Sequence, residues 1–301
     1  MIAVTELIKF LGSEVLQTFG KTEGRFVKHL RPVESVDEDT LDWIGRLRPD
    51  KQRIAEVTTA KVILCDPMVL FTDSLSKQDK VLIYVNNPKL ALALIADNFF
   101  VAKPAPGLHP SSSIHPEAEI DASVYVGPNC SIGKCVIGED TRIYPNVTIY
   151  DGVTIGRRSI IQAGAVIGTD GLGCERKEDG TLVKFPHLGG VEIGDDVEIG
   201  ANSQIARGAL SNTTIGNGCK LNGFCFVAHN CVLGKNVLIT GNSMLAGSVK
   251  VENNVSIYSN VIVREQRTIG QGATIGMGSV VTRDVPAGET WVGNPAKRFE
   301  K

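Results

Sequence analysis

Residues 193–205 read IGDDVEIGANSQI, with an isoleucine at every sixth position. The same spacing extends in both directions, over residues 114–281. The aliphatic positions are Ile137, Ile143, Ile149, Ile155, Ile161, Ile167, Ile193, Ile199, Ile205, Ile215, Leu221, Val227, Leu233, Ile239, Leu245, Val251, Ile257, Val263, Ile269, Ile275 and Val281. Four residues after most of them stands a small or slim side chain, such as Val197 or Ser203. This pattern fits neither a helix, with its period of about 3.6 residues, nor a flat, alternating strand.

A period of six residues predicts a stacked β-solenoid. Each repeat supplies a short strand and a tight turn, so three repeats would close a triangular coil of about 18 residues. Two stretches interrupt the period. Residues 168–192 are charged and rich in glycine, and residues 209–212 add four more positions. We expect the longer one to leave the coil as a surface loop, where solenoid insertions often form a binding face.

The first hundred residues lack the six-residue period. Lys61–Cys65 and Val81–Val85 have the composition of strands, and Asn87-Pro88 is a typical start for a helix. A length of 301 residues suits about two domains. We therefore predict a mainly β fold in which a small α/β domain precedes the solenoid. The predicted boundaries are 1–103 for the α/β domain, 104–113 for a linker, 114–285 for the solenoid with an insert at 168–192, and 286–301 for a C-terminal tail.

Composition excludes several classes of protein. A formal net charge of -2 gives no sign of a nucleic-acid partner. No apolar run reaches the roughly 20 residues of a membrane span, and the first residues lack the layout of a secretion signal, so we expect a cytoplasmic protein. The seven cysteines form no CxxC pair. Four of them fall on the small inward position, where a thiol acts as an apolar filler, and no metal is expected. These are Cys130, Cys219, Cys225 and Cys231.

His229 is the candidate for chemistry. It follows Val227 by two residues, so it should point away from the solenoid core, although a lone histidine is also compatible with a structural role. Gly247 comes 18 residues later, one coil above, and its backbone N–H would be open to a ligand beside the imidazole. A base and a donor to an oxyanion are the two requirements of acyl transfer to an amine or hydroxyl. Asn222 and Asn230 lie nearby in the sequence and are candidates for substrate binding.

Residues 126–250 resemble UDP-3-O-acylglucosamine N-acyltransferase, a left-handed β-helix enzyme of lipid A synthesis. The similar stretches are Asn146–Tyr150, Gly168–Gly173, Ile193–Ala201, Arg207–Leu210 and Ala228–Asn230. The resemblance implies a left-handed parallel β-helix and a homotrimer with active sites between subunits. It implies that His229 is the general base and that the Gly247 N–H holds the oxyanion. It also implies a nucleotide-sugar substrate whose base stacks near Trp43, which could instead anchor a small core.

Three features depart from that family. The family has a second histidine about 37 residues after the catalytic one. Gln266 is closest to that place here and is a further candidate for substrate binding. Glu265 falls on the His229 column two coils up, where it could orient the imidazole or stand as a solvated charge. The aspartate before Arg207-Gly208 is replaced by Ala206. The family's long final helix, which helps to dock acyl carrier protein, is also missing from this sequence.

The C-terminal stretches Ile275–Val281 and Val292–Lys297 are similar to the end of hexapeptide acetyltransferases that use acetyl-CoA. That similarity implies a coenzyme A site with Gly276, Lys297 and Arg298, although the two basic residues also fit a solvated tail. Our preferred prediction is therefore an N-acyltransferase that moves an acetyl or other short acyl group from acyl-CoA to the amine of a nucleotide-linked amino sugar, in bacterial cell-surface polysaccharide synthesis. The alternatives are the lipid A enzyme that uses acyl carrier protein and a non-catalytic binding solenoid.

Overall fold

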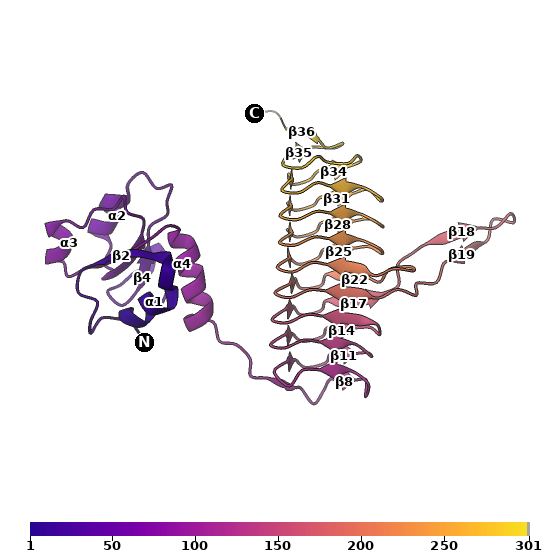
Figure 1. Ribbon diagram of the computed structural model, residues 1–301, viewed down its shortest axis with the longest axis horizontal. Helices are drawn as coiled ribbons and strands as arrows, with labels where there is room; N and C mark the ends of the chain where they lie inside the picture. The colour runs from indigo at the N-terminus through magenta and orange to yellow at the C-terminus, as the bar shows by residue number, and fades with distance from the viewer. Residues whose placement is uncertain (300–301) are drawn as a thin grey trace. The chain divides into compact units, whose positions relative to one another are not determined.

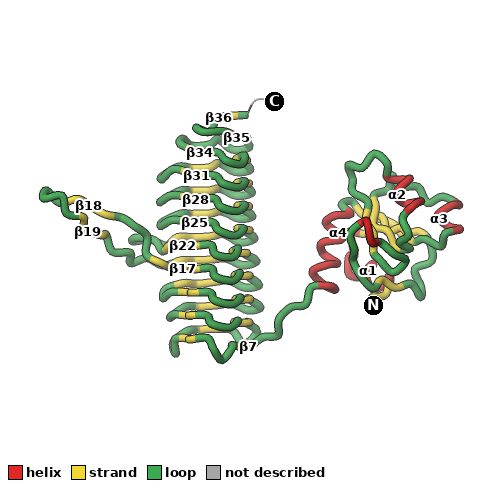
Figure 2. The backbone as a smooth tube through the Cα atoms, turned by 180° about the vertical axis from the view of Figure 1, so that it is seen from behind, coloured by secondary structure: helices red, strands yellow, loops and turns green. Residues whose placement is uncertain are grey.

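The computed structural model describes residues 1–299 of the chain, which forms two compact units, Met1–Lys103 and Pro104–Lys301. Figures 1 and 2 show the first as a small α/β body and the second as a stack of short strands. No helix in the described part of the chain is both long and apolar enough to span a bilayer.

The first unit is a four-stranded sheet with helices on both faces. Its sheet has the order β2-β6-β5-β4, in which β4, β5 and β6 are parallel and β2 is antiparallel to β6. The elements are β1 (Ile2–Ala3), α1 (Val4–Leu11), β2 (Val15–Phe19), β3 (Phe26–Val27), β4 (Leu41–Trp43), α2 (Lys51–Val57), β5 (Val62–Cys65), α3 (Asp73–Lys77), β6 (Val81–Val85) and α4 (Pro88–Ile95). Short helical turns cover Gly12–Glu14, Val33–Ser35 and Ala96–Phe100.

The two central strands alternate between two cores. Val62, Leu64, Val81, Ile83 and Val85 pack with α1 and α4, whereas Ile63, Cys65, Leu82 and Tyr84 pack with α2 and α3. Burial on both faces explains why both strands are continuous apolar runs. The predicted strands and the predicted helix after Asn87 are confirmed. Asn87 caps α4, because its Oδ1 accepts a hydrogen bond from the Leu90 amide at 3.2 Å.

The second unit is a prism with three parallel sheets as its faces. The first sheet holds β7 (Gly107–Leu108), β10 (Tyr125–Val126), β13 (Arg142–Ile143), β16 (Ile160–Ile161), β21 (Glu198–Ile199), β24 (Lys220–Leu221), β27 (Leu238–Ile239), β30 (Ser256–Ile257), β33 (Thr274–Ile275), β35 (Thr290–Val292) and β36 (Lys297–Arg298). The second sheet holds β8 (Ser113–Ile114), β11 (Ser131–Ile132), β14 (Thr148–Ile149), β17 (Val166–Thr169), β22 (Gln204–Ala206), β25 (Phe226–Val227), β28 (Met244–Leu245), β31 (Ile262–Val263) and β34 (Val280–Val281). The third sheet holds β9 (Glu119–Ile120), β12 (Val136–Ile137), β15 (Val153–Ile155), β20 (Val191–Ile193), β23 (Thr213–Ile215), β26 (Val232–Leu233), β29 (Lys250–Val251) and β32 (Thr268–Ile269).

The six-residue period accounts for this architecture. Leu221 pairs with Ile239, and Val227 pairs with Leu245, so one coil takes 18 residues and stacks like residues above each other. The aliphatic positions and most of the small positions after them form one buried core. Asparagine recurs at the turns with φ between 55° and 61°, a region that it tolerates better than most residues. The predicted left-handed parallel β-helix is confirmed.

The coil extends beyond the predicted solenoid boundaries at both ends. β7 lies inside the predicted linker, yet it pairs in parallel with β10. β35 lies inside the predicted tail, yet it pairs in parallel with β33, and β36 then runs antiparallel to β35. Backbone pairing continues there although the aliphatic period has weakened, which is why the sequence pattern placed both boundaries too far inward. Residues 300 and 301 of the predicted tail lie outside the described residues.

The insert at 168–192 contains an antiparallel hairpin, β18 (Cys174–Arg176) and β19 (Leu182–Lys184). Figures 1 and 2 show it projecting from the side of the prism. The insert connects β17 of the second sheet to β20 of the third, and the shorter interruption at 209–212 connects β22 to β23. Both interruptions therefore leave the same corner of the prism.

Candidate active site

His229 lies at the corner from which both interruptions leave. It follows β25 of the second sheet and precedes β26 of the third. Its side chain is half-buried and is not among the residues of the solenoid core. Gly247 occupies the same corner one coil later, between β28 and β29. The structure thus brings the predicted base and the predicted backbone donor together.

Asn230 fixes the protonation of the imidazole. Its Oδ1 lies 3.0 Å from His229 Nδ1 and also accepts from the Ala209 amide at 3.0 Å. Its Nδ2 donates to the Ser211 carbonyl at 3.2 Å, so the orientation of the side-chain amide is set by two backbone partners. Because Oδ1 can only accept, the neutral imidazole carries its proton on Nδ1. Nε2 is then left with a lone pair, the state that a general base requires.

The next coil lies directly against the Nε2 edge of His229. A Cβ added to Gly247 would lie 2.8 Å from Nε2 and 2.7 Å from Cε1 of the ring, so only glycine leaves room for the imidazole. Within residues 1–299, the Gly247 amide donates none of the backbone hydrogen bonds found in turns and loops. A free N–H beside a base with a lone pair can polarise a carbonyl while the base takes a proton.

The insert covers the opposite edge of the ring. A Cβ on Gly171 would lie 2.8 Å from His229 Cδ2 and 2.7 Å from His187 Nε2. The rings of His187 and His229 meet edge to face, with centroids 5.2 Å apart and planes at 76°. His187 is a residue that the sequence did not single out. The only signal for it was its position in an insert that we expected to serve a binding face.

His187 is buried with one ring nitrogen unsatisfied. Its Nδ1 lies 3.1 Å from the Phe185 carbonyl, which can only accept, so Nδ1 carries the proton. Its Nε2 is buried and has no hydrogen-bond partner among the described residues. A buried acceptor without a donor costs about 1–3 kcal/mol, so this atom is a feature to be explained.

Glu265, a possible partner of His229 or a solvated charge from the sequence, is bonded to Arg264 in the structure. Its carboxylate accepts from Arg264 Nε at 3.0 Å, is more than half exposed, and has its pKa lowered by that hydrogen bond. The partner of the imidazole is Asn230 instead. Glu265 does share the column of His229, but two coils separate residues by about 10 Å, too far for a hydrogen bond.

Two other predicted substrate residues do not contact the imidazole. Asn222 lies at another corner of the prism, and Gln266 reaches the site only through its backbone. Asn222 follows β24 at the corner between the first and second sheets, and its Oδ1 accepts from the Gly223 amide at 2.7 Å. Gln266 donates its backbone N–H to the Gly247 carbonyl at 3.0 Å. Of the predicted substrate residues in the solenoid, Asn222, Asn230 and Gln266, only Asn230 hydrogen-bonds to the imidazole within residues 1–299.

The predicted coenzyme A residues lie at the last coils. A Cβ on Gly276 would lie 2.6 Å from Val292 Cγ1, so this glycine is required for packing against β35. Arg298 Nε lies 3.6 Å from Glu289 Oε1, and Lys297 is exposed. The structure therefore gives Gly276 a packing partner and Arg298 an ion-pair partner, and both Lys297 and Arg298 are exposed.

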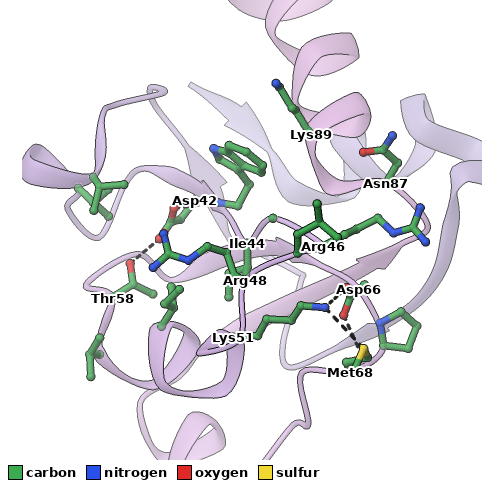
Figure 3. A pocket seen from close by; sticks show the side chains of 18 of the residues that line it. Asp42, Ile44, Arg46, Arg48, Lys51, Thr58, Asp66, Met68, Asn87 and Lys89 are labelled. Atoms are coloured by element: carbon green, nitrogen blue, oxygen red, sulfur yellow. Dashed lines mark hydrogen bonds and ion pairs between the residues drawn. The ribbon is translucent and has the colours of Figure 1, made fainter. Parts of the chain in front are cut away.

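The first unit contains a pocket of about 1310 Å³ lined by Trp43. Arg46 and Lys89 line it as exposed cations, and Asn87 lies beside Lys89 at its edge, as Figure 3 shows. Also in Figure 3, a buried ion pair joins Lys51 Nζ to Asp66 Oδ2 at 2.5 Å. The pocket thus combines an aromatic ring with basic side chains. Among residues 1–299, no group of three or more His, Cys, Asp or Glu side chains has the arrangement of a metal site.

Comparisons with known proteins define the class first. Residues 134–169, 212–247 and 248–283 match the family described as "Bacterial transferase hexapeptide (six repeats)". Residues 190–223 match the "Hexapeptide repeat of succinyl-transferase". The predicted assignment to the hexapeptide-repeat acyltransferases is confirmed by these matches and by the relatives that follow.

Curated relatives are named UDP-3-O-acylglucosamine N-acyltransferase. The protein from Pseudomonas putida is 43% identical over 167 residues, which cover 48% of this chain and 47% of the relative. The protein from Bordetella pertussis is 33% identical over 229 residues, which cover 68% of this chain and 63% of the relative. The matched region spans about half the length of the first of these relatives.

Solved structures of UDP-N-acetylglucosamine acyltransferase share the fold. LpxA from Bacteroides fragilis matches with a TM-score of 0.59 and 28% identity, over 64% of this chain and 74% of that one. LpxA from Acinetobacter baumannii matches with a TM-score of 0.58 and 28% identity, over 64% and 73%. The names of these relatives and of the solved structures thus specify UDP-linked glucosamine derivatives as their substrates.

Proposed function

We propose that this chain transfers an acyl group from a thioester to the amine of a UDP-linked glucosamine derivative. The observation that carries the proposal is the pairing of His229 Nε2, which bears a lone pair, with the backbone of Gly247 directly beside it. The names of the relatives supply the acceptor class, because the N-acyltransferases and the LpxA proteins share a UDP-linked sugar. As predicted from the sequence, the reaction would take place in the cytoplasm.

The proposed chemistry balances with these two groups. The acceptor nitrogen attacks the thioester carbonyl, forming a C–N bond, while His229 Nε2 takes the proton that this nitrogen loses. The carbonyl oxygen becomes an oxyanion that accepts a hydrogen bond from the Gly247 amide. The C–S bond then breaks, and the imidazolium returns its proton to the leaving thiolate. Asn230 holds the Nδ1–H throughout, and so stabilises the positive charge on the ring.

The nucleotide of the acceptor would bind in the pocket of the first unit. Trp43 offers a face for stacking a base. Arg46 and Lys89 offer cations for the two phosphates. In this proposal, Trp43 stacks on the base, as the resemblance implied, and Arg46 and Lys89 bind the two phosphates. Binding of UDP to the full chain, lost in Trp43→Ala, would be its direct measurement.

We also propose the homotrimer that the resemblance implied. The outward column of the second sheet becomes apolar at Phe226, Met244 and Ile262, beside the corner of His229. Met244 and Ile262 are exposed in the single chain, which suits burial against a neighbouring subunit. Sedimentation of the full chain at micromolar concentration measures this directly.

For the donor, we propose the thioester of acyl carrier protein in place of acetyl-CoA, our preferred prediction from the sequence. Two observations support the change. The curated relatives carry the name that we held as the alternative, the lipid A enzyme. The coenzyme A residues Gly276 and Arg298 have local packing and ion-pair partners. Both basic residues of that predicted site, Lys297 and Arg298, are exposed.

The test is a thiol-release assay with UDP-3-O-acylglucosamine as acceptor and either acyl carrier protein thioesters or acetyl-CoA as donor. We expect release from the carrier-protein thioester, with a loss of 10²-fold or more in His229→Ala, on the order reported for general bases. Release from acetyl-CoA alone would restore the short-acyl prediction. A chain that binds the UDP-sugar and releases no thiol from either donor would instead be a binding solenoid.

A further inference from the structure

His187 is a buried imidazole for which the proposed chemistry has no use. Its side chain is only 5% exposed, and its Nε2 lacks a hydrogen-bond partner among the described residues. It lies on the segment that returns from β19 to β20, four residues before the coil resumes at Val191. The insert projects into solvent, but the side chain of His187 packs back against the prism at His229.

The position of Nε2 is defined by Gly171. A Cβ on this glycine would touch both His187 Nε2 and His229 Cδ2, so both atoms lie on the same side of the Gly171 backbone. The proton of neutral His187 is on Nδ1, held by the Phe185 carbonyl. Nε2 therefore bears a lone pair, and the resting His229 offers it no N–H, since His229 Nδ1–H is bound to Asn230.

The charged side chains of Asp170 and Arg207 have hydrogen-bond partners other than His187. Asp170 accepts from Lys184 Nζ at 2.6 Å, and this hydrogen bond lowers the pKa of the carboxyl group. Arg207 donates through Nε to the Gly168 carbonyl at 3.0 Å, and also to the Asp151 carbonyl. Neither charge is a hydrogen-bond partner of His187, so the lone pair on Nε2 remains unsatisfied in the resting state.

We propose that His187 is a positioning residue for His229 and that its Nε2 lone pair stabilises the imidazolium formed during acyl transfer. This inference rests on the proposed function. When His229 takes the proton of the acceptor, its ring becomes positively charged within the edge-to-face contact of 5.2 Å. In this state the lone pair of His187 Nε2 lies near a positive charge that is absent in the resting state. Stabilisation that appears only when charge develops lowers the barrier, whereas equal binding of both states would not.

Three variants separate this role from packing. His187→Leu has a similar volume and no lone pair, whereas His187→Gln keeps a polar acceptor. We expect kcat to fall about 10-fold in His187→Leu with KM within about twofold of wild type, because the effect arises only as charge develops. His187→Gln should recover most of the lost kcat. The matched control is His109→Leu, at an exposed histidine, which should leave kcat unchanged.

The outcomes distinguish the two proposals. Wild-type chain without thiol release would overturn the proposed function and this role with it. Active wild-type chain with an unchanged kcat in His187→Leu would overturn only the role of His187. If His187→Leu lowers the melting temperature, the comparison passes to His187→Gln and His187→Asn at matched stability. Equal losses in kcat and in melting temperature for both would identify a purely structural residue.

Discussion

Two glycines hold the imidazole of His229 from opposite edges. Gly247 belongs to the next coil, and Gly171 belongs to the insert, so neither is a neighbour of His229 in sequence. Both approach so closely that a methyl group in either place would overlap the ring. The position of the His229 ring therefore depends on glycine at both places as well as on the hydrogen bond to Asn230.

Gly171→Ala should lower kcat about 10²-fold, because displacing a catalytic group by about 1 Å has an effect of that order. Gly173→Ala is its matched control in the same insert. A Cβ at Gly173 meets nothing closer than 3.7 Å, and the position has no positive φ. We expect wild-type kcat in the control and similar melting temperatures for both. Equal rates in the two variants would contradict this account of the site.

Glu265→Gln should leave acyl transfer within about twofold of wild type, because the carboxylate is bound to Arg264 and is exposed to solvent. The kcat of this variant, measured beside Asn230→Ala, checks the reassignment. Asn230→Ala removes the acceptor of the Nδ1 proton and should lose activity. A large loss in Glu265→Gln would return that residue to the site.

At the scale of the element, the repeating unit is a strand of two or three residues that turns one side chain inward. β27 shows this in two neighbours, since Leu238 is exposed and Ile239 is buried in the core. The inward side chain was predictable because its period is fixed by the coil. The insert was not, because β18, β19 and the return to His187 follow no period and depend on contacts with a coil distant in sequence.

Ile239→Ala should destabilise the solenoid by about 2–5 kcal/mol, the usual cost of truncating a buried aliphatic side chain. Leu238→Ala, one residue away, should change the unfolding free energy of the single chain by only about 0.5 kcal/mol. Urea unfolding of both variants gives the two values. Similar values would mean that the inward and outward sides of β27 are not distinct.

For the whole molecule, the periodic unit was predicted more fully than the α/β unit. The stacking period of 18 residues alone predicts Gly247 one coil above His229. The same period puts Glu265 in the column of His229, but a shared column does not bring residues two coils apart within hydrogen-bonding distance. The pocket around Trp43 was only implied by resemblance. It is assembled from β4, α2 and the loops after β4, β5 and β6, and no local pattern in the sequence records that assembly.

Thiol labelling tests which cysteine side chains are buried in the folded protein. Cys174 is exposed, and the other six cysteines are buried. Burial disfavours the thiolate and raises the pKa of Cys65 and Cys231 to about 12 and that of Cys135 to about 11. At pH 7.5 we expect one reactive thiol per native chain and all seven in denaturant. More than one rapid reaction in the native state would reveal an open coil.

The reversal of the chain at β36 has a consequence for how these molecules behave when crowded together. A stack of parallel rungs invites a second stack to continue it, and unprotected edges of this kind seed fibres. Here β36, the last strand of the described residues, is antiparallel to β35 and bears Lys297 and Arg298, so an incoming copy meets the wrong polarity and a like charge. The molecule should therefore stay discrete at concentrations where an uncapped prism would grow into filaments.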